Sequence, residues 1–116
     1  MAMQSIEQQR AKAALAWAEK GVDDKALSAA VAMPAMILMN GLGQTAAFYK
    51  SKGGAQDGLY QLLSDWLKQV GKPYVGKDLL AGITEGNAQT YRAAQVEALA
   101  YLQWVKKFAK AYAKGE

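Results

Sequence analysis

The 116-residue sequence contains no cysteine and no histidine, and only two prolines. Without cysteine there is no disulfide, no thiolate nucleophile and no Cys ligand for zinc. Without histidine there is no Ser-His-Asp triad and no imidazole general base. Any catalysis would therefore depend on carboxylates or lysines. Because no spacing of the carboxylates gathers two of them in one pocket, we expect no enzymatic activity, no metal site and no cofactor.

Long hydrophobic runs are absent as well. The most apolar stretch, residues 29–39, is far shorter than the roughly 20 residues of a membrane-spanning helix, and it contains Pro34. The N-terminal residues lack the apolar segment of a secretory signal. We therefore expect a cytoplasmic protein that makes no contact with a membrane.

The residues that are present favour helices. Segments rich in Ala, Leu, Gln, Lys and Met alternate with glycines, and β-branched residues rarely alternate with polar ones. The length fits one domain, residues 1–116, with 52% hydrophobic residues to form a core. The expected fold is all-α, a compact bundle of about five to six helices with a long C-terminal helix packed against the others.

Capping residues and glycines place the helices. The predicted caps are a capping box of Ser5 and Gln8, Asp23 or Asp24, and Asp78. Pro34 predicts a kink or a break in the second helix. The predicted helices cover residues 5–20, 23–40 and 42–52, a fourth that carries an apolar stripe over 59–70, a short one at 78–84, and 87–114.

The last predicted helix is the longest and has an a/d pattern of apolar residues, spaced alternately by three and four. A core helix and a coiled-coil dimer both produce such a pattern. The core helix is favoured because the repeating residues are mainly Ala and Tyr rather than Leu and Ile. They are Tyr91, Ala94, Ala98, Tyr101, Val105, Phe108 and Tyr112.

The same helix carries most of the net charge of +4. From residue 87 onward there are five Lys or Arg residues and two acids, whereas the first 86 residues hold nine and eight. In helical projection the cations lie beside the apolar face, with Lys106 at the edge, whereas Glu97 and Trp104 lie on the opposite flank. We name as the basic stripe Arg92, Lys107, Lys110 and Lys114.

The basic stripe has two interpretations. It is either a solvated helix face or a contact for a nucleic-acid backbone, since a row of cations displaces condensed counterions. A shorter cluster, Lys50 and Lys52 before two glycines, is either a phosphate contact or an ordinary helix end.

Two further patterns carry less information. The Gly-x-Gly of residues 41–43 lacks the third glycine and the preceding strand of a dinucleotide site, although the helix that starts after it could accept an anion. The aromatic residues are expected in the core, except Tyr49 and Tyr74 beside turns, and none forms a base-stacking platform on a sheet.

Four segments of the sequence resemble one known family. Residues 33–48 are similar to the Pro-x-x-apolar-x-x-Asn-Gly-Leu-x-Gln-x-small-small-Phe stretch of the small subunit of the type III-B CRISPR effector, the Cmr complex. The similarity continues at residues 50–53 and 62–67 and ends in residues 91–109. Each motif alone is weak, but their common order over the whole chain makes the resemblance specific.

The resemblance implies a non-catalytic subunit. In that family small subunits stack into a minor filament beside the crRNA-bearing backbone subunits and help to hold the crRNA–target RNA duplex. The implied partners are the backbone and large Cmr subunits, copies of the chain, crRNA and target RNA. We expect the isolated chain to be monomeric and to bind RNA poorly.

The nucleic-acid-binding residues follow from two sources. Matching motifs carry over Lys50, Lys52, Arg92, Lys106 and Lys107, while Lys110 and Lys114 join them by helical phase. The short chain, its Ala-rich first helix and its turn at residues 71–76 depart from the family pattern. Two alternatives remain, a protein-only helical adaptor whose lysines are solvated and a small hydrolase or lyase that uses carboxylates.

Overall fold

The computed structural model describes residues 3–70 and 78–113, and in these ranges it contains α-helices and no strand. The expected all-α bundle and its long final helix are confirmed. The helices are α1 (Ile6–Glu19), α2 (Asp24–Asn40), α3 (Leu42–Lys52), α4 (Gly54–Val70), α5 (Leu79–Glu85) and α6 (Ala88–Tyr112). The turn expected at residues 71–76, with Tyr74, lies outside the described residues.

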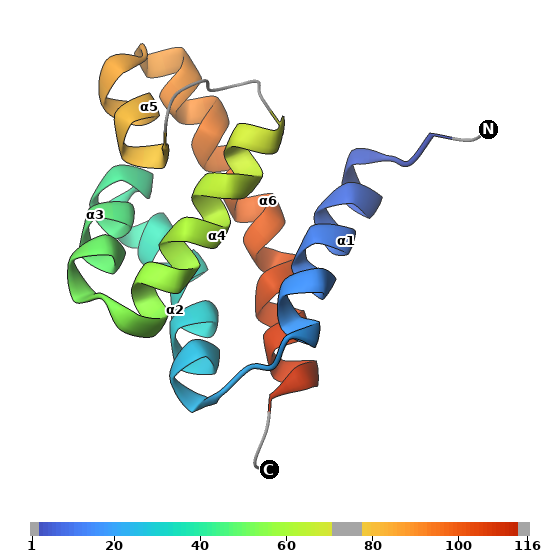
Figure 1. The fold of residues 1–116 in the computed structure, drawn as a ribbon. Helices are drawn as coiled ribbons and strands as arrows, with labels where there is room; N and C mark the ends of the chain where they lie inside the picture. The colour runs from blue at the N-terminus through green and yellow to red at the C-terminus, as the bar shows by residue number, and fades with distance from the viewer. Residues whose placement is uncertain (1–2, 71–77, 114–116) are drawn as a thin grey trace.

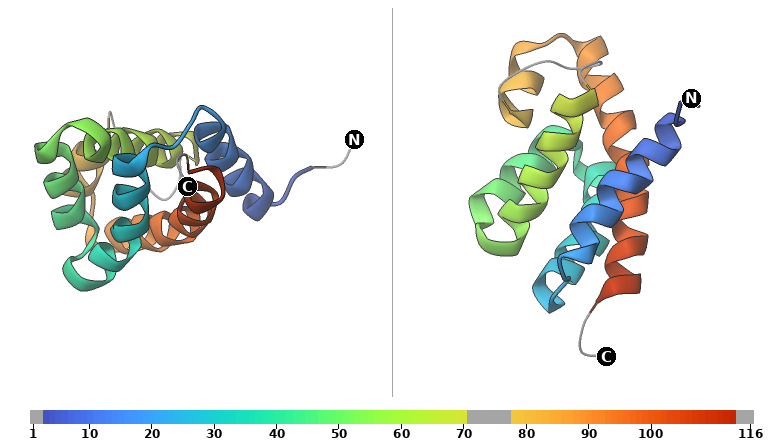
Figure 2. Two further views of the ribbon diagram at one scale, coloured as in Figure 1. Left: turned by 90° about the horizontal axis from the view of Figure 1, so that it is seen from below. Right: turned by 45° about the vertical axis from the view of Figure 1, so that its right-hand side comes forward.

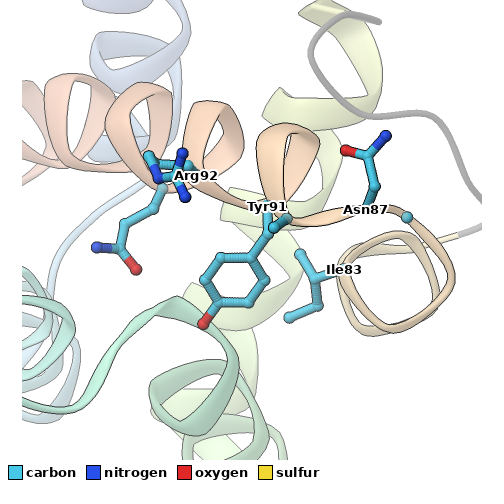
Figure 3. A pocket seen from close by; sticks show the side chains of 7 residues that line it. Ile83, Asn87, Tyr91 and Arg92 are labelled. Atoms are coloured by element: carbon cyan, nitrogen blue, oxygen red, sulfur yellow. The ribbon is translucent and has the colours of Figure 1, made fainter.

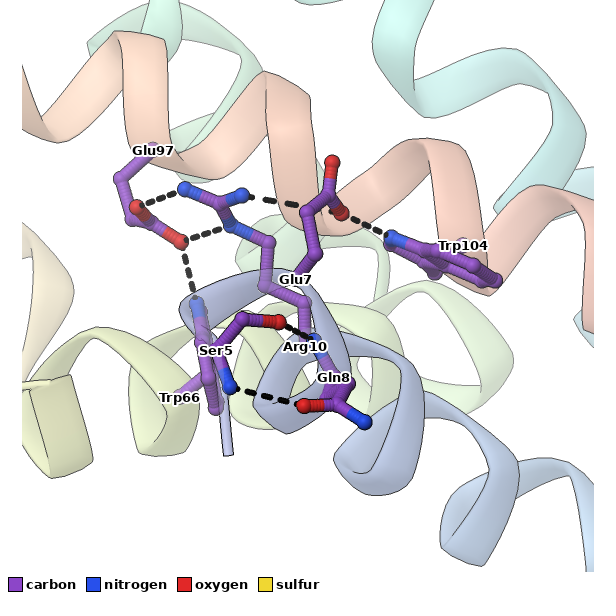
Figure 4. A network of polar contacts seen from close by, with 7 residues as sticks. All are labelled: Ser5, Glu7, Gln8, Arg10, Trp66, Glu97 and Trp104. Atoms are coloured by element: carbon purple, nitrogen blue, oxygen red, sulfur yellow. Dashed lines mark hydrogen bonds and ion pairs between the residues drawn. The ribbon is translucent and has the colours of Figure 1, made fainter. Parts of the chain in front are cut away.

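Side-chain caps define four helix starts. Ser5 and Gln8 form the predicted capping box, with N···O distances of 2.8 and 3.1 Å (Figure 4). Asp23 and Asp78 accept from backbone N–H groups at 2.8 and 2.9 Å, as predicted. Asn87 caps α6 in the same way, accepting from the Thr90 N–H at 2.8 Å.

The second helix passes through its proline without interruption. Pro34 lies inside the 17-residue helix α2, so the alternative of a break was wrong. Pro34, Met33 and Ile37 are all buried, and this packing offsets the missing hydrogen bond. A kink at this position stays a prediction.

Helix α6 is the axis on which the other helices pack (Figures 1 and 2). Both α1 and α2 lie along it, α4 packs on α2, α3 and α6 itself, and α3 lies against α2 and α4. The short α5 closes the end of the bundle where α6 begins. Its first two N–H groups donate to Ser64 Oγ at 3.0 Å and to Tyr60 Oη at 3.2 Å of α4.

The a/d residues of α6 form part of the core of this chain. Ala94, Ala98, Tyr101 and Val105 are fully buried, which confirms the core helix over the coiled-coil dimer. Leu102 and Ala109 are buried as well. Because both α1 and α2 cover α6, its buried face is wider than the a and d positions alone. Tyr112, expected on this face, is 42% exposed as the last residue of the helix.

Two aromatic predictions on α3 were wrong. Tyr49 is buried, although it was expected beside a turn, and its hydroxyl donates to the Ala29 carbonyl at 2.7 Å. This burial raises the pKa of Tyr49 to about 12. Phe48 is 41% exposed, because neighbouring helical residues point about 100° apart and α3 directs Tyr49 into the core.

None of the helices in the described ranges is both long enough and apolar enough to cross a lipid bilayer.

Candidate nucleic-acid interface

The outer face of α6 carries the described members of the basic stripe. Arg92, Lys107 and Lys110 are exposed, as the phase argument predicted, and Lys106 is half-buried at the edge of the core. Arg92 and Lys110 are 18 residues apart, so this row of cations spans about 27 Å at 1.5 Å per residue. Lys114 lies outside the described residues.

The single acid of α6 faces α1 and is paired inside the chain (Figure 4). Glu97 accepts from Arg10 Nε at 2.7 Å and from Arg10 Nη2 at 2.8 Å, a two-bond pair between α6 and α1. The Nε1 of Trp66 donates to the same carboxylate at 2.9 Å. The Glu97 and Arg10 side chains are only 12% and 14% exposed.

These contacts set the ionisation of Glu97. Burial raises the pKa of its carboxyl, and the hydrogen bonds from Arg10 and Trp66 outweigh burial, so the pKa lies below its usual value. Glu97 therefore stays ionised and neutralises Arg10. Helix α6 itself therefore offers no free carboxylate to its cations, although Glu7 of α1 lines a surface hollow together with Lys107.

A second contact holds α1 on the same flank of α6. The Nε1 of Trp104 donates to Glu7 Oε1 at 2.6 Å (Figure 4). Glu7 also lies 3.7 Å from Arg10 Nη1. The flank of α6 that carries Glu97 and Trp104 is thus where α1 docks, and Lys107 borders this flank.

The second lysine cluster is separate from the first. Lys50 and Lys52 are exposed at the end of α3, and α2 lies between this corner and the C-terminal half of α6 (Figures 1 and 2). Each Nζ lies over an aromatic ring, Lys50 at 5.1 Å from the Tyr60 centroid and Lys52 at 5.3 Å from that of Phe48. The structure therefore groups the predicted residues into two regions.

The start of α3, considered as an anion site, is occupied by the protein itself. The Leu42 N–H donates to Gln95 Oε1 at 2.9 Å, and the Gly43 N–H donates to Tyr91 Oη at 2.8 Å. The anion hypothesis for this helix start was therefore wrong. Two segments that carry the family resemblance, one around Gly41 and one starting at Tyr91, bind each other here.

A pocket of about 380 Å³ lies between α5 and the first turns of α6 (Figure 3). Figure 3 shows the Tyr91 ring beside Ile83, with Arg92 on one side and Asn87 on the other. Sequence reasoning did not find this pocket, because its walls come from the packing of α5 on α6. Its lining residues are Ile83, Gly86, Asn87, Ala88, Tyr91, Arg92 and Gln95.

Within residues 3–70 and 78–113, no group of three Asp, Glu, His or Cys side chains lies close enough together to hold a metal ion.

Compared with known protein families, the chain matches the family described as CRISPR-associated protein (Cas_Cmr5) over residues 6–112. The match spans all six helices, from the first residue of α1 to the last of α6. The chain belongs to this family, the small subunits of the type III-B Cmr complex.

Proposed function

As a member of this family the chain is a component of the Cmr complex in CRISPR defence, and we propose that it is a non-catalytic subunit that holds RNA through the outer face of α6. The observation that carries the proposal is that the cations Arg92, Lys107 and Lys110 of α6 are exposed and form no ion pair within the described chain. The only acid of α6, Glu97, is bound to Arg10 of α1. The ligand we propose is the duplex of crRNA and target RNA.

The arrangement fits a backbone contact rather than base reading. Arg92 near one end of α6, and Lys107 and Lys110 about 22–27 Å further along, suit contacts with separate phosphates of a polyanion. The two regions of cations, α6 and the end of α3, suit a subunit that touches RNA at more than one point along a filament. Lys106, half-buried, contributes less to this surface than Lys107.

Family membership implies association with other Cmr subunits. We propose that copies of the chain also stack in a minor filament through exposed apolar side chains. Leu38 and Met39, adjacent at the end of α2, are 71% and 80% exposed, which is unusual for two large neighbouring apolar residues. We also propose a cytoplasmic location, as expected for an RNA-targeting assembly.

The direct test exchanges Lys107 and Lys110 for Glu. Both side chains are exposed, so we expect an unchanged fold and weaker retention of target RNA by the assembled complex. Each phosphate that the variant no longer neutralises should make the slope of log K against log salt shallower by about 0.7–0.9. The readout is filter binding of labelled target RNA at several salt concentrations.

The matched control exchanges Lys12 and Lys25, both exposed, on α1 and α2. It makes the same change in net charge away from the basic stripe. Equal RNA retention in both variants and the parent complex would contradict the proposal and favour the protein-only adaptor. Impaired co-purification of Cmr subunits with unchanged RNA affinity would favour the adaptor too.

A further inference from the structure

The pocket at the start of α6 adjoins the basic stripe and has no role in the function proposed above. Arg92, the first member of the stripe, forms one side of it. Its volume of about 380 Å³ falls in the range of small-ligand sites, roughly 300–1,000 Å³. The pocket is therefore large enough for one small aromatic group and its substituents.

Its apolar wall is fixed by the fold. The Tyr91 hydroxyl accepts from the Gly43 N–H at 2.8 Å, which holds the ring beside Ile83 (Figure 3). A Cβ on Gly43 would lie 3.2 Å from Tyr91 Oη and 3.4 Å from Ile83 Cδ1, so only glycine allows this approach freely. The wall is preorganised and needs no rearrangement to receive a flat ligand.

The side-chain polar groups left over in the pocket are donors. The side-chain oxygens of Asn87 and Gln95 already accept from the Thr90 and Leu42 N–H groups, so their amide nitrogens remain for a ligand. Arg92 has no ion pair within the described chain and offers five N–H groups. No carboxylate lines the pocket. The complementary ligand carries acceptors and negative charge.

We infer that this pocket binds one unpaired nucleotide of the RNA, with the base against Tyr91 and Ile83 and the phosphate at Arg92. A nucleotide joins a flat apolar ring, acceptor atoms and an anion in one ligand, which is what the two sides of the pocket require. Continuity with the row of cations on α6 places the pocket next to the proposed path of the RNA backbone. The inference rests on the proposed function.

The test is a titration of the ¹⁵N-labelled full chain, followed by amide chemical shifts. Three probes separate the two parts of the site: 5′-AMP, adenosine and ribose 5-phosphate. We expect millimolar 5′-AMP to shift resonances of residues 83–95, with weaker and partial effects of the other two probes. Arg92→Gln should weaken 5′-AMP and ribose 5-phosphate by about five- to tenfold and leave adenosine unchanged.

A second pair of variants keeps the test independent of folding. Ala88→Glu places an acid in the pocket at the N-terminal end of α6, where the helix dipole favours it, and should abolish binding of 5′-AMP. Gln89→Glu makes the same charge change one residue on, outside the lining, and should keep most of the affinity. Equal affinity in both variants would overturn the inference, as would the absence of shifts at residues 83–95.

The result is separable from the test of the proposed function. Exchange of Lys107 and Lys110 for Glu should leave the 5′-AMP titration unchanged, because neither residue lines the pocket. Loss of target-RNA retention in that variant, together with no 5′-AMP binding, would sustain the function and reject the pocket. Binding of 5′-AMP, together with target-RNA retention that the lysine exchange leaves unchanged, would sustain the pocket and reject the proposed RNA contact of the lysines.

Discussion

The two sides of α6 differ in whether their polar groups have partners. On the inner side Tyr91, Gln95 and Glu97 each form side-chain hydrogen bonds with another helix at 2.7–2.9 Å. On the outer side Arg92, Lys107 and Lys110 form no ion pair within the described chain. Since nearly all of these residues belong to one segment that resembles the family, the resemblance alone does not separate fold from function. In the structure the residues of the first group join α6 to other helices, whereas those of the second are exposed and form no ion pair within the described residues.

This difference predicts two kinds of mutational effect. Substitutions on the inner side leave buried groups without partners and cost folding free energy. Substitutions on the outer side remove only charges available to a ligand and leave the free energy of unfolding nearly unchanged. An inner-side substitution that costs no stability, or an outer-side substitution that costs much, would contradict this difference between the two sides.

The largest loss of stability is expected for Glu97→Ala. It leaves the largely buried Arg10 without its anion and Trp66 Nε1 without an acceptor, and breaking a buried pair in this way costs about 3 kcal/mol. Urea unfolding followed by circular dichroism measures it. The control is Arg92→Ala on the outer side, with an expected change within about 0.5 kcal/mol. A Glu97→Ala loss below that of the control would refute the structural role of the pair.

The next largest effect is expected for Gly41→Ala. Gly41 has φ +89° and ψ 160°, a conformation that costs other residues roughly 1–3 kcal/mol, and a Cβ there would lie 3.3 Å from Tyr91 Oη. Urea unfolding again gives the change. The control is Gly58→Ala inside α4, where nothing lies within 4 Å, and there we expect a neutral or stabilising change of about 0.5–1 kcal/mol. Similar losses at both glycines would contradict this explanation.

Local rules were sufficient for most of the fold. The caps at Ser5, Asp23 and Asp78, and the exposed phase of Lys107, depend on neighbours within a turn or two, and the structure confirms them. The N–H groups at the Gly-x-Gly of residues 41–43 were predicted to be open to an anion. This prediction failed because the partner of the Gly43 N–H, Tyr91, lies 48 residues later in the sequence. Tertiary partners at such separations have no periodic signature.

The same reasoning explains the missed site features. The pocket exists because α5 and α6 meet at a particular angle, and the pairing of Glu97 with Arg10 joins residues 87 positions apart. The continuous helix at Pro34 reflects burial of that residue, which outweighs local propensity. Helical phase still placed Glu97 and Trp104 on one flank, and only the identity of the partner, α1, was missing.

A third prediction uses pH to test whether the charge of Glu97 is what stabilises the inner side of α6. Burial raises the pKa of Glu97, but the Arg10 and Trp66 bonds lower it more, so the folded-state pKa lies below the unfolded value of about 4.3. The pair therefore stabilises the fold fully above that value and loses its contribution as pH falls through the lower, folded-state pKa. Glu97→Gln should be less stable than the parent at pH 7, and the difference should shrink towards pH 3. A difference that is constant with pH would contradict ionisation as its source.

The smallest effect is expected for substitutions of Lys106 and Lys107, two adjacent lysines at the boundary between the inner and outer sides of α6. Lys107 is exposed on the outer face and Lys106 is half-buried at its edge, although both match the same motif. Lys107→Gln should weaken target-RNA retention in the assembled complex by about two- to threefold at low salt, as for one phosphate contact, with unfolding unchanged. Lys106→Gln should alter retention less, and because the aliphatic stem of Lys106 covers apolar surface it should lower stability slightly. Filter binding and urea unfolding of the two variants side by side give both quantities. If Lys106→Gln weakened RNA binding more than Lys107→Gln, the RNA would contact the core-side edge of α6 at Lys106. That result would contradict the proposed contact with the outer face.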